Sequence, residues 1–297
     1  MRILLAVSGG VDSMYLACRA GELFPGAGFG IAHCNFCLRG SESDGDEAFV
    51  REFASARGIP FFCTRFSTAA YASENGISIE MAARDLRYAW FSRLCREEGF
   101  DAVAVAHNAN DNAETLLLNL LRGTGSRGLR GMAEDSMAQG LRVLRPLLNL
   151  SRGEIEAGMR AMGQDWREDS TNAQSEVKRN KLRNLVFPVF SEINPSFVRT
   201  LSRDMAHFRQ ADDIAEDYFR GAGLCLEEGV DLRRLLSLKH WKFVLYRLLE
   251  PCNLSEETFC KLVELLESGR TVSGKVFQSP THIVSIKLKT LSAAPRG

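Results

Sequence analysis

The first half of the chain alternates short apolar runs with longer segments of helical periodicity. The runs expected to form strands are Ile3–Val7, Gly30–Cys34, Pro60–Phe66 and Ala102–Ala106, with a shorter fifth at Leu141–Leu144. The segments expected to form helices lie near Ser13–Leu23, Ser43–Arg57, Ile79–Glu98 and Asp111–Arg122. This alternation is typical of βαβ units. It predicts an α/β fold, a parallel sheet with helices on both faces.

The pattern changes after Pro188. Phe197–Phe219, Asp231–Leu249 and Glu256–Leu266 have helical periodicity, and His282–Leu288 is the one strand-like run. We therefore expect a boundary near residue 190, with a catalytic domain over 1–190 and a smaller all-α domain over 191–297. The helices of the second domain would be stabilised by packing their apolar faces together.

Composition narrows the class of protein. The 297 residues are 45% hydrophobic and 25% charged, which is ordinary for a soluble globular protein. The sequence contains no apolar run long enough to span a bilayer, so we expect a cytoplasmic protein with no membrane partner. Its 37 basic and 37 acidic residues balance, so net charge neither requires nor excludes a nucleic-acid partner.

The segment Ser8–Ser13, SGGVDS, follows the first expected strand and opens a helix. Two glycines allow a sharp turn and close approach to a ligand, and a helix N-terminus attracts anions. The hydroxyls of Ser8 and Ser13 are further donors, and Asp12 can hold Mg²⁺ or cap the helix. The alternative is an ordinary strand–turn–helix junction. The position at the first βα junction favours a phosphate site formed by Ser8, Gly9, Gly10, Val11, Asp12 and Ser13.

Three groups of charged residues allow a functional and a structural interpretation. Asp111 and Glu114 share a helix face and can hold an ammonium group, or they can complement the helix dipole. His107 follows a strand end and can be a catalytic or an ordinary core histidine. Arg84 and Arg87, with Glu80, can contact phosphate oxygens or form an ion-pair ladder.

Cys34 and Cys37 have the CxxC spacing of some metal and redox sites, with His33 beside them. Such sites usually need a second pair, and none follows in the sequence. We expect the eight cysteines to be reduced and this pair to bind no metal.

The motifs together resemble a known family. SGGVDS is similar to the pyrophosphate loop of the N-type ATP pyrophosphatases, which cleave ATP between its α and β phosphates. Further stretches, in the same order as in the tRNA(Ile)-lysidine synthetases, are His33–Ser41, Ile79–Tyr88, His107–Thr115, Arg122–Met132, Arg145–Leu147, Trp166 with Asp169–Asn172, and Arg179–Arg183. Residues 1–190 resemble that family closely, and the remainder resembles it weakly.

The resemblance implies a reaction and its participants. An enzyme of this family uses ATP and Mg²⁺ to adenylate the wobble cytidine of a tRNA(Ile) with a CAU anticodon, and free L-lysine then displaces AMP to leave lysidine. The catalytic residues would be Asp111, Glu114, His107 and Arg87. The nucleotide would be held by the Ser8–Ser13 loop, His33 and Arg84, with Asp12 as a candidate Mg²⁺ ligand.

The chain differs from the family motif His-x-x-Asp-Asp-Gln-x-Glu-Thr at two positions. Asn110 stands where the motif has its first Asp, and Asn112 stands where it has Gln. Asp111 is kept as the main candidate for the acid that binds lysine.

RNA contact is expected along two basic stretches, although basic runs are often only solvated surface. Their residues are Arg122, Arg127, Arg130, Arg142, Arg145 and Arg152, then Lys178, Arg179, Lys181 and Arg183. The residues from Thr271 onward resemble the start of a further C-terminal module. A homodimer is compatible with the sequence. Two alternatives stay open, a tRNA thiolation enzyme with the same loop and a non-catalytic RNA-binding protein.

Overall fold

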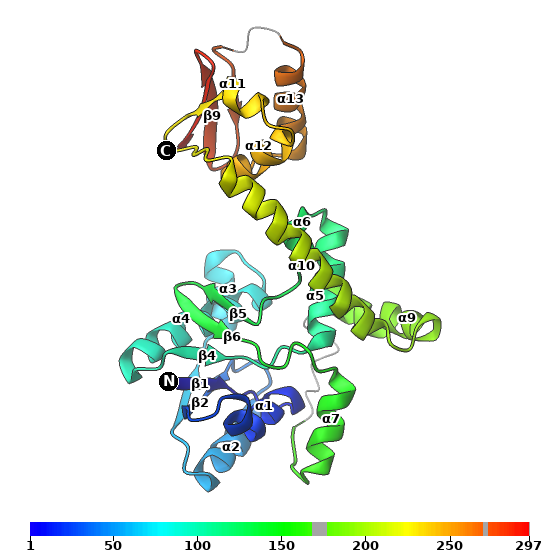
Figure 1. The fold of residues 1–297 in the computed structure, drawn as a ribbon. Coiled ribbons are helices and arrows are strands. Elements are labelled where there is room, and N and C mark those ends of the chain that lie inside the picture. Colours follow the sequence, from blue (N-terminus) through cyan, green and yellow to red (C-terminus); the bar gives the residue numbers. More distant parts are fainter. Residues whose placement is uncertain (168–176, 270–272, 297) are drawn as a thin grey trace. The chain divides into compact units, whose positions relative to one another are not determined.

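The structure, a computed structural model, describes residues 1–167, 177–269 and 273–296. The chain divides into two compact units, Met1–Arg209 and Gln210–Gly297 (Figure 1). This division comes later than the boundary expected near residue 190. The reason is a cluster of aromatic side chains: Phe187 and Phe197, with ring centroids 4.9 Å apart, pack with Ala113 and Leu118. The segments around these two rings therefore belong to the first unit.

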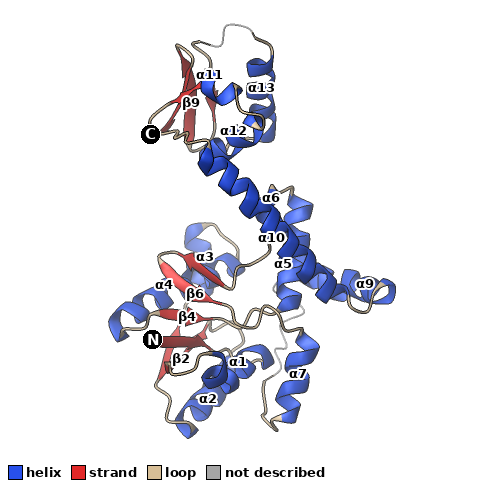
Figure 2. Cartoon of the chain, viewed as in Figure 1, coloured by secondary structure: helices blue, strands red, loops and turns tan. Residues whose placement is uncertain are grey.

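The first unit contains a six-stranded sheet with the order β3-β2-β1-β4-β6-β5 (Figure 2). Its strands are β1 (Arg2–Ala6), β2 (Gly28–Asn35), β3 (Phe61–Arg65), β4 (Ala102–Ala104), β5 (Asp135–Ala138) and β6 (Leu141–Leu144). All neighbours pair in parallel except β5, which is an antiparallel edge strand. The predicted parallel sheet is confirmed. The edge strand was not expected, because its residues Asp-Ser-Met-Ala form no apolar run.

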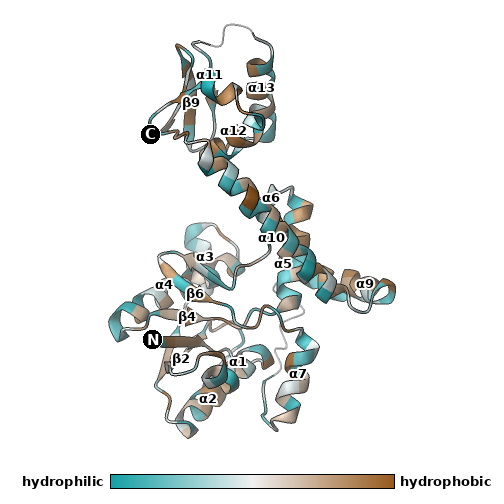
Figure 3. Ribbon diagram, in the orientation of Figure 1, coloured by the Kyte–Doolittle hydropathy of each residue, from teal (hydrophilic) through white to brown (hydrophobic). Residues whose placement is uncertain are grey.

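Helices cover both faces of this sheet, as predicted. The helices that begin in the first unit are α1 (Val11–Leu23), α2 (Ser41–Ala56), α3 (Thr68–Asn75), α4 (Ile79–Glu98), α5 (Ala109–Arg122), α6 (Ser126–Leu129), α7 (Arg152–Ala161), α8 (Val177–Lys181), the π-helix η2 (Leu182–Val186), α9 (Phe187–Ile193) and α10 (Phe197–Gly221), which continues into the second unit. Successive side chains of β1 point to opposite faces. Ile3 and Leu5 pack with α1, α2 and α7, whereas Leu4 packs with α4. Figure 3 shows that β1 is hydrophobic along most of its length.

The second unit is smaller, as expected, but the prediction that it is all-α is wrong. Its helices α11 (Leu232–Leu236), α12 (Trp241–Leu249) and α13 (Glu256–Glu267), with a 3₁₀ turn η3 (Glu250–Cys252), pack on a four-stranded antiparallel sheet. The strands β7 (Val230–Asp231), β8 (Val276–Gln278), β9 (His282–Lys287) and β10 (Thr290–Pro295) have the order β7-β10-β9-β8.

The all-α prediction missed this sheet because most of its strands have weak sequence signals. The run at His282–Leu288 is confirmed as β9, which places Val284 and Ile286 in the core. Its partner β10 is rich in small residues, and β7 and β8 have two and three residues. Strands this short do not show the alternation that identifies a strand in sequence.

No helix of the described residues is both long enough and apolar enough to cross a membrane.

A glycine in β2 makes the packing of this sheet testable. A Cβ atom at Gly30 would lie 2.4 Å from Cζ of Phe100 and 3.2 Å from Cε2 of Phe62. We expect Gly30→Ala to lower the free energy of unfolding by about 1–3 kcal/mol, because both rings would have to move. Urea unfolding measures this. Gly28→Ala in the same strand is the matched control, since its Cβ would meet only an ordinary contact at 3.6 Å. Equal stability of the two variants would contradict the packing described.

Candidate active site

The Ser8–Ser13 loop connects β1 to α1, and its hydrogen bonds centre on one hydroxyl. Oγ of Ser13 accepts from the backbone amides of Ser8 (3.1 Å) and Gly9 (3.2 Å) and donates to the carbonyl oxygen of Gly10 (2.9 Å). Gly9 has φ +100°, a backbone conformation that residues other than glycine rarely adopt. No side chain caps the N-terminus of α1 at Gly10. The arrangement suits an anion, which would satisfy the open amides of the first turn.

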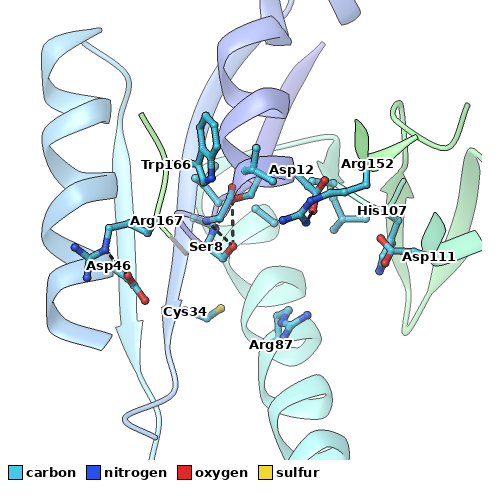
Figure 4. A pocket seen from close by; sticks show the side chains of 18 of the residues that line it. Ser8, Asp12, Cys34, Asp46, Arg87, His107, Asp111, Arg152, Trp166 and Arg167 are labelled. Atoms are coloured by element: carbon cyan, nitrogen blue, oxygen red, sulfur yellow. Dashed lines mark hydrogen bonds and ion pairs between the residues drawn. The ribbon is translucent and has the colours of Figure 1, made fainter. Parts of the chain in front are cut away.

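A cavity of about 630 Å³ lies at the carboxyl ends of β1, β2 and β4 (Figure 4). This is the edge of a parallel sheet at which ligands usually bind. The residues expected in the site that line it are Ser8, Gly10, Val11, Asp12, Ser13, Arg87, His107 and Asp111. Residues up to 103 positions apart in the sequence thus meet around one cavity of suitable size for a nucleotide.

Four expected residues do not line this cavity. Gly9 provides the turn of the loop. His33 is buried, and its Nδ1 lies 2.9 Å from the carbonyl oxygen of Val7, so it contacts the strand that leads into the loop. The guanidinium of Arg84 lies over the ring of Tyr88, 5.0 Å from its centroid. Glu114 lines a second, adjoining cavity.

Asp12 lies in the main cavity with both carboxylate oxygens engaged. Oδ1 accepts from Nδ2 of Asn108 (3.0 Å), and Oδ2 forms an ion pair with Arg152. Burial raises the pKa of Asp12, and the nearby carboxylate of Asp111 raises it further, while Arg152 lowers it. Mg²⁺ is usually bound by one or two carboxylates together with substrate phosphates. Asp12, beside the phosphate loop, fits that donor set.

Asp111 has two structural roles. It completes a capping box at the start of α5: its Oδ2 accepts from the amide of Asn108 (3.1 Å), and Oδ1 of Asn108 accepts from the amide of Asp111 (3.1 Å). Its other oxygen, Oδ1, accepts from Nη2 of Arg183 at 3.0 Å. The structural interpretation of this acid as a first-turn residue is therefore correct, and it also faces the cavity.

Arg183, from the π-helix η2, bridges the two acids that were expected to hold an ammonium group. Its Nη2 donates to Asp111 and also to Glu114 (3.0 Å), and its Nε pairs with Glu114. The side chain of Glu114 is only 1% exposed. Burial raises the pKa of Glu114, and its hydrogen bond with Arg183 opposes that rise. The acidic pair already has a cation from its own chain.

The second cavity, of about 460 Å³, adjoins the first. The two share four lining residues: Asp111, Arg152, Asn180 and Arg183. Asn180 is buried, and its Nδ2 has no partner among the described residues. A donor of this kind, at the junction of two cavities, is available to a ligand.

His107 also has an unsatisfied atom. Its Nδ1 is buried without a hydrogen-bond partner in the described part of the chain. Burial lowers the pKa of His107 to about 4, although Asp111 opposes the shift. The imidazole is therefore neutral at pH 7 and can accept a proton or a hydrogen bond.

One residue of the cavity wall, Arg167, was missed by the sequence interpretation. Arg167 donates from Nε to Oδ1 of Asp46 (2.8 Å), and Arg39 donates to Oδ2 of the same carboxylate (2.8 Å). The amide of Arg167 also donates to the carbonyl of Gly9 (2.9 Å), which ties this segment to the phosphate loop. Arg167 lies 121 residues from Asp46, so no local pattern could indicate the pair. The motif residues Asp169–Asn172 lie outside the described residues.

Comparison with known proteins agrees with this geometry. Residues 1–190 match the sequence profile of the PP-loop domain, and residues 227–291 match that of the TilS substrate binding domain. A tRNA(Ile)-lysidine synthase of Chlorobaculum tepidum is 40% identical over 91% of this chain and 85% of its own. The chain belongs to the tRNA(Ile)-lysidine synthase family.

Other relatives of this family are longer. A tRNA(Ile)-lysidine synthase of Bacteroides thetaiotaomicron is 38% identical over 94% of this chain but 64% of its own length, so the chain spans less than two thirds of that protein. Among solved structures, a U34-tRNA thiolase of Methanococcus maripaludis with a [4Fe-4S] cluster has a TM-score of 0.58 at 17% identity. The likeness covers 70% of this chain and 72% of the thiolase. It shows a shared fold.

The two departures from the lysidine synthase motif have structural roles. Oδ1 of Asn110 accepts from the amide of Arg152 (3.0 Å) and so joins the starts of α5 and α7. Oδ1 of Asn112 accepts from the amide of Met132 (2.6 Å) at the end of the glycine-rich loop. In each case the side-chain oxygen of the asparagine accepts a hydrogen bond from a backbone amide.

Four of the basic residues expected to meet RNA pair with other groups of the chain, and of these four only Arg145 is buried. Arg145 is buried and donates to the carbonyl of Ala133 (3.0 Å). Arg152 and Arg183 pair with acids of the cavities, and Arg142 pairs with Asp135 (2.6 Å). RNA contact by the other residues of the two stretches stays a prediction.

The thiols differ in environment. Cys34 lines the main cavity, and burial raises its pKa to about 12, whereas Cys37 is exposed. Among the described residues, no three His, Cys, Asp or Glu side chains group in a way that could hold a metal ion.

The lowered pKa of His107 makes stability depend on pH. The unfolded chain takes up this proton near pH 6.5, while the folded chain takes it up near pH 4. Between these values the unfolded state binds more protons, so stability falls as the pH drops from 6.5 towards 4. We expect His107→Asn to lose less stability than the parent chain over this range, by about 1–3 kcal/mol.

Thermal unfolding at pH 7 and pH 5 measures this difference. His207→Asn, which removes an exposed histidine of α10, is the control. An identical pH dependence in His107→Asn and the parent chain would contradict a buried neutral imidazole.

Proposed function

We propose that this protein ligates lysine to the C2 carbon of the wobble cytidine in a tRNA(Ile) with a CAU anticodon. The reaction consumes ATP and yields lysidine, AMP and pyrophosphate. The observation that carries the proposal is the pair of adjoining cavities, one beside the phosphate loop and one beside an acidic pair. A reaction that joins an adenylated base to an amine needs two sites that meet at the reacting carbon. The family match supports the choice of substrates.

The first step transfers AMP to the base. The C2 oxygen of the cytidine attacks the α-phosphorus, and pyrophosphate leaves from the Ser8–Ser13 loop, whose amides and hydroxyls would bind it. Arg87, which lines the same cavity, is a guanidinium suited to the charge that develops on the α-phosphate. Mg²⁺, when bound, would neutralise phosphate charge, and Asp12 is the residue that would hold it.

The second step forms the carbon–nitrogen bond. The ε-amine of lysine attacks C2, and AMP leaves with the oxygen that it carried. Lysine arrives as an ammonium and must lose a proton before attack. Asp111 lines both cavities, so its carboxylate can orient the ammonium and receive that proton. Glu114 completes the acidic pair, and His107 is a neutral acceptor in the same wall.

The same proposal places the protein in the cytoplasm, where tRNA, ATP and free lysine occur together. A homodimer remains compatible with it.

A tRNA thiolation enzyme is the alternative within the same fold. Such an enzyme would use reactive cysteines, either as a thiolate nucleophile or as two CxxC pairs that hold an iron–sulfur cluster. The Cys34 thiol, the cysteine of the main cavity, has a pKa raised to about 12 and is protonated at pH 7. A non-catalytic RNA-binding protein would have no use for two cavities lined by charged groups.

We expect full turnover to require three substrates together. Incubation with ATP, lysine and a CAU-anticodon tRNA(Ile) should yield AMP, pyrophosphate and lysidine, measured by mass spectrometry of the wobble nucleoside. Omission of lysine should stop the reaction before lysidine forms. Incorporation of sulfur into tRNA without lysine would show that the alternative is correct.

Asp111→Asn should impair lysine use more than ATP binding. The amide keeps one hydrogen-bond acceptor for the cap of α5 but removes the charge that would attract an ammonium. We expect KM for lysine to rise at least about tenfold, with KM for ATP changed much less. The control is Asp135→Asn, an exposed acid of β5 that lines neither cavity. Equal loss of both affinities would show that Asp111 has a different role.

A further inference from the structure

The hairpin of β9 and β10 in the second unit has an unusual turn. Lys287 pairs with Thr290, so only Leu288 and Lys289 connect the strands. Both have positive φ, 48° and 72°. Two-residue turns of this kind are dominated by Asn and Gly, because a branched or long side chain is disfavoured in the left-handed conformation. Leucine is a poor choice for this position on local grounds.

Burial does not explain the leucine either. Leu288 is 89% exposed, the highest value among the large hydrophobic side chains of the described residues. The turn is nevertheless held in place: the amide of Leu288 donates to Oγ of Ser273 (3.2 Å), and the carbonyl of Lys289 accepts from the amide of Leu232 (2.9 Å). An apolar side chain is thus presented to solvent on a backbone fixed from two sides.

The surroundings of this side chain are basic. Lys287 and Lys289 flank it, and Lys275 lies next to β9, where its carbonyl accepts from the amide of Ile286 (2.9 Å). All three lysines are exposed, and none forms an ion pair with another described residue. The acid beside the turn, Asp231, is already paired with Arg233 at 3.0 Å. An apolar tip surrounded by unpaired cations complements a polyanion that also offers an apolar surface.

We propose that the tip formed by Lys275, Lys287, Leu288 and Lys289 is an RNA contact. Phosphates would meet the lysines, and Leu288 would pack against an exposed base or sugar, as apolar wedges do at nucleic acids. This rests on the proposed function, in which a tRNA is the substrate. An anionic membrane also combines negative charge with apolar groups, but a single leucine buries little surface for anchoring.

The turn allows a test in which loss of binding cannot be ascribed to loss of folding. Leu288→Asn places a residue that this turn favours, so we expect unchanged or higher thermal stability. The same variant should bind a tRNA(Ile) transcript about tenfold more weakly, with an unchanged dependence of affinity on salt. Lys287→Gln should also weaken binding, but it should reduce the salt slope by about one, because one phosphate contact is lost.

Ile214→Gln is the matched control. It removes a large apolar side chain that is 72% exposed on α10 in the same unit, and it should leave tRNA affinity unchanged. The full chain is used throughout, with filter binding across a range of salt concentrations.

Two outcomes would overturn the inference. The first is parent-like tRNA affinity in Leu288→Asn. The second is binding to vesicles containing phosphatidylserine that depends on Leu288 while tRNA binding does not.

Failure of the proposed function would look different. A parent chain that binds tRNA through Leu288 but forms no lysidine would retain the contact and refute the reaction. A parent chain that forms lysidine, together with parent-like tRNA affinity in Leu288→Asn, would refute only the contact.

Discussion

The site depends on placing three carboxylates where they are partly or fully removed from water. Asp12, Asp111 and Glu114 lie near the N-termini of α1 and α5, and burial raises the pKa of Asp12 and of Glu114. Arg152 and Arg183 supply the matching charge, and Asn108 donates to Asp12. Helix starts, which carry partial positive charge, favour the same anions. Removing either arginine would leave a largely buried carboxylate with weaker compensation, from Asn108 at Asp12 or from Arg179 at Glu114, and this is more costly than the loss of an exposed ion pair.

Much of the α/β unit could be predicted from sequence because its signals are local. The apolar runs became β1, β2, β3, β4 and β6, and the glycines of the Ser8–Ser13 loop stand at the turn that they were expected to form. Less of the structure of the second unit could be predicted from sequence. Its core is built from helices that were recognised and from strands of two to six residues, of which only β9 alternates clearly.

The site shows the same division between local and distant signals. The pairing of Asp111 with Glu114 follows from helical spacing, so their shared environment was predictable. The bridge that Arg183 forms between them and the bond from Arg167 to Asp46 join residues 69 to 121 positions apart. Local sequence patterns therefore could not indicate these contacts. Likewise, arginine is usually a surface residue, and only the folded structure shows that Arg145 is buried and donates to the carbonyl of Ala133.

The bridging arginine makes the acidic pair a competitive site. Arg183 is tethered to the carboxylates by its own chain, so its effective concentration there is high and constant. Any free cation that binds the pair must share it with, or displace, this internal competitor, and its apparent affinity falls by the fraction of time for which the pair is occupied. Arg183 stands in a π-helical turn, Leu182–Val186, a rare geometry that is often found at functional sites. The affinity of the site is therefore set partly by the stability of that turn, and a substitution there can change it without touching either acid.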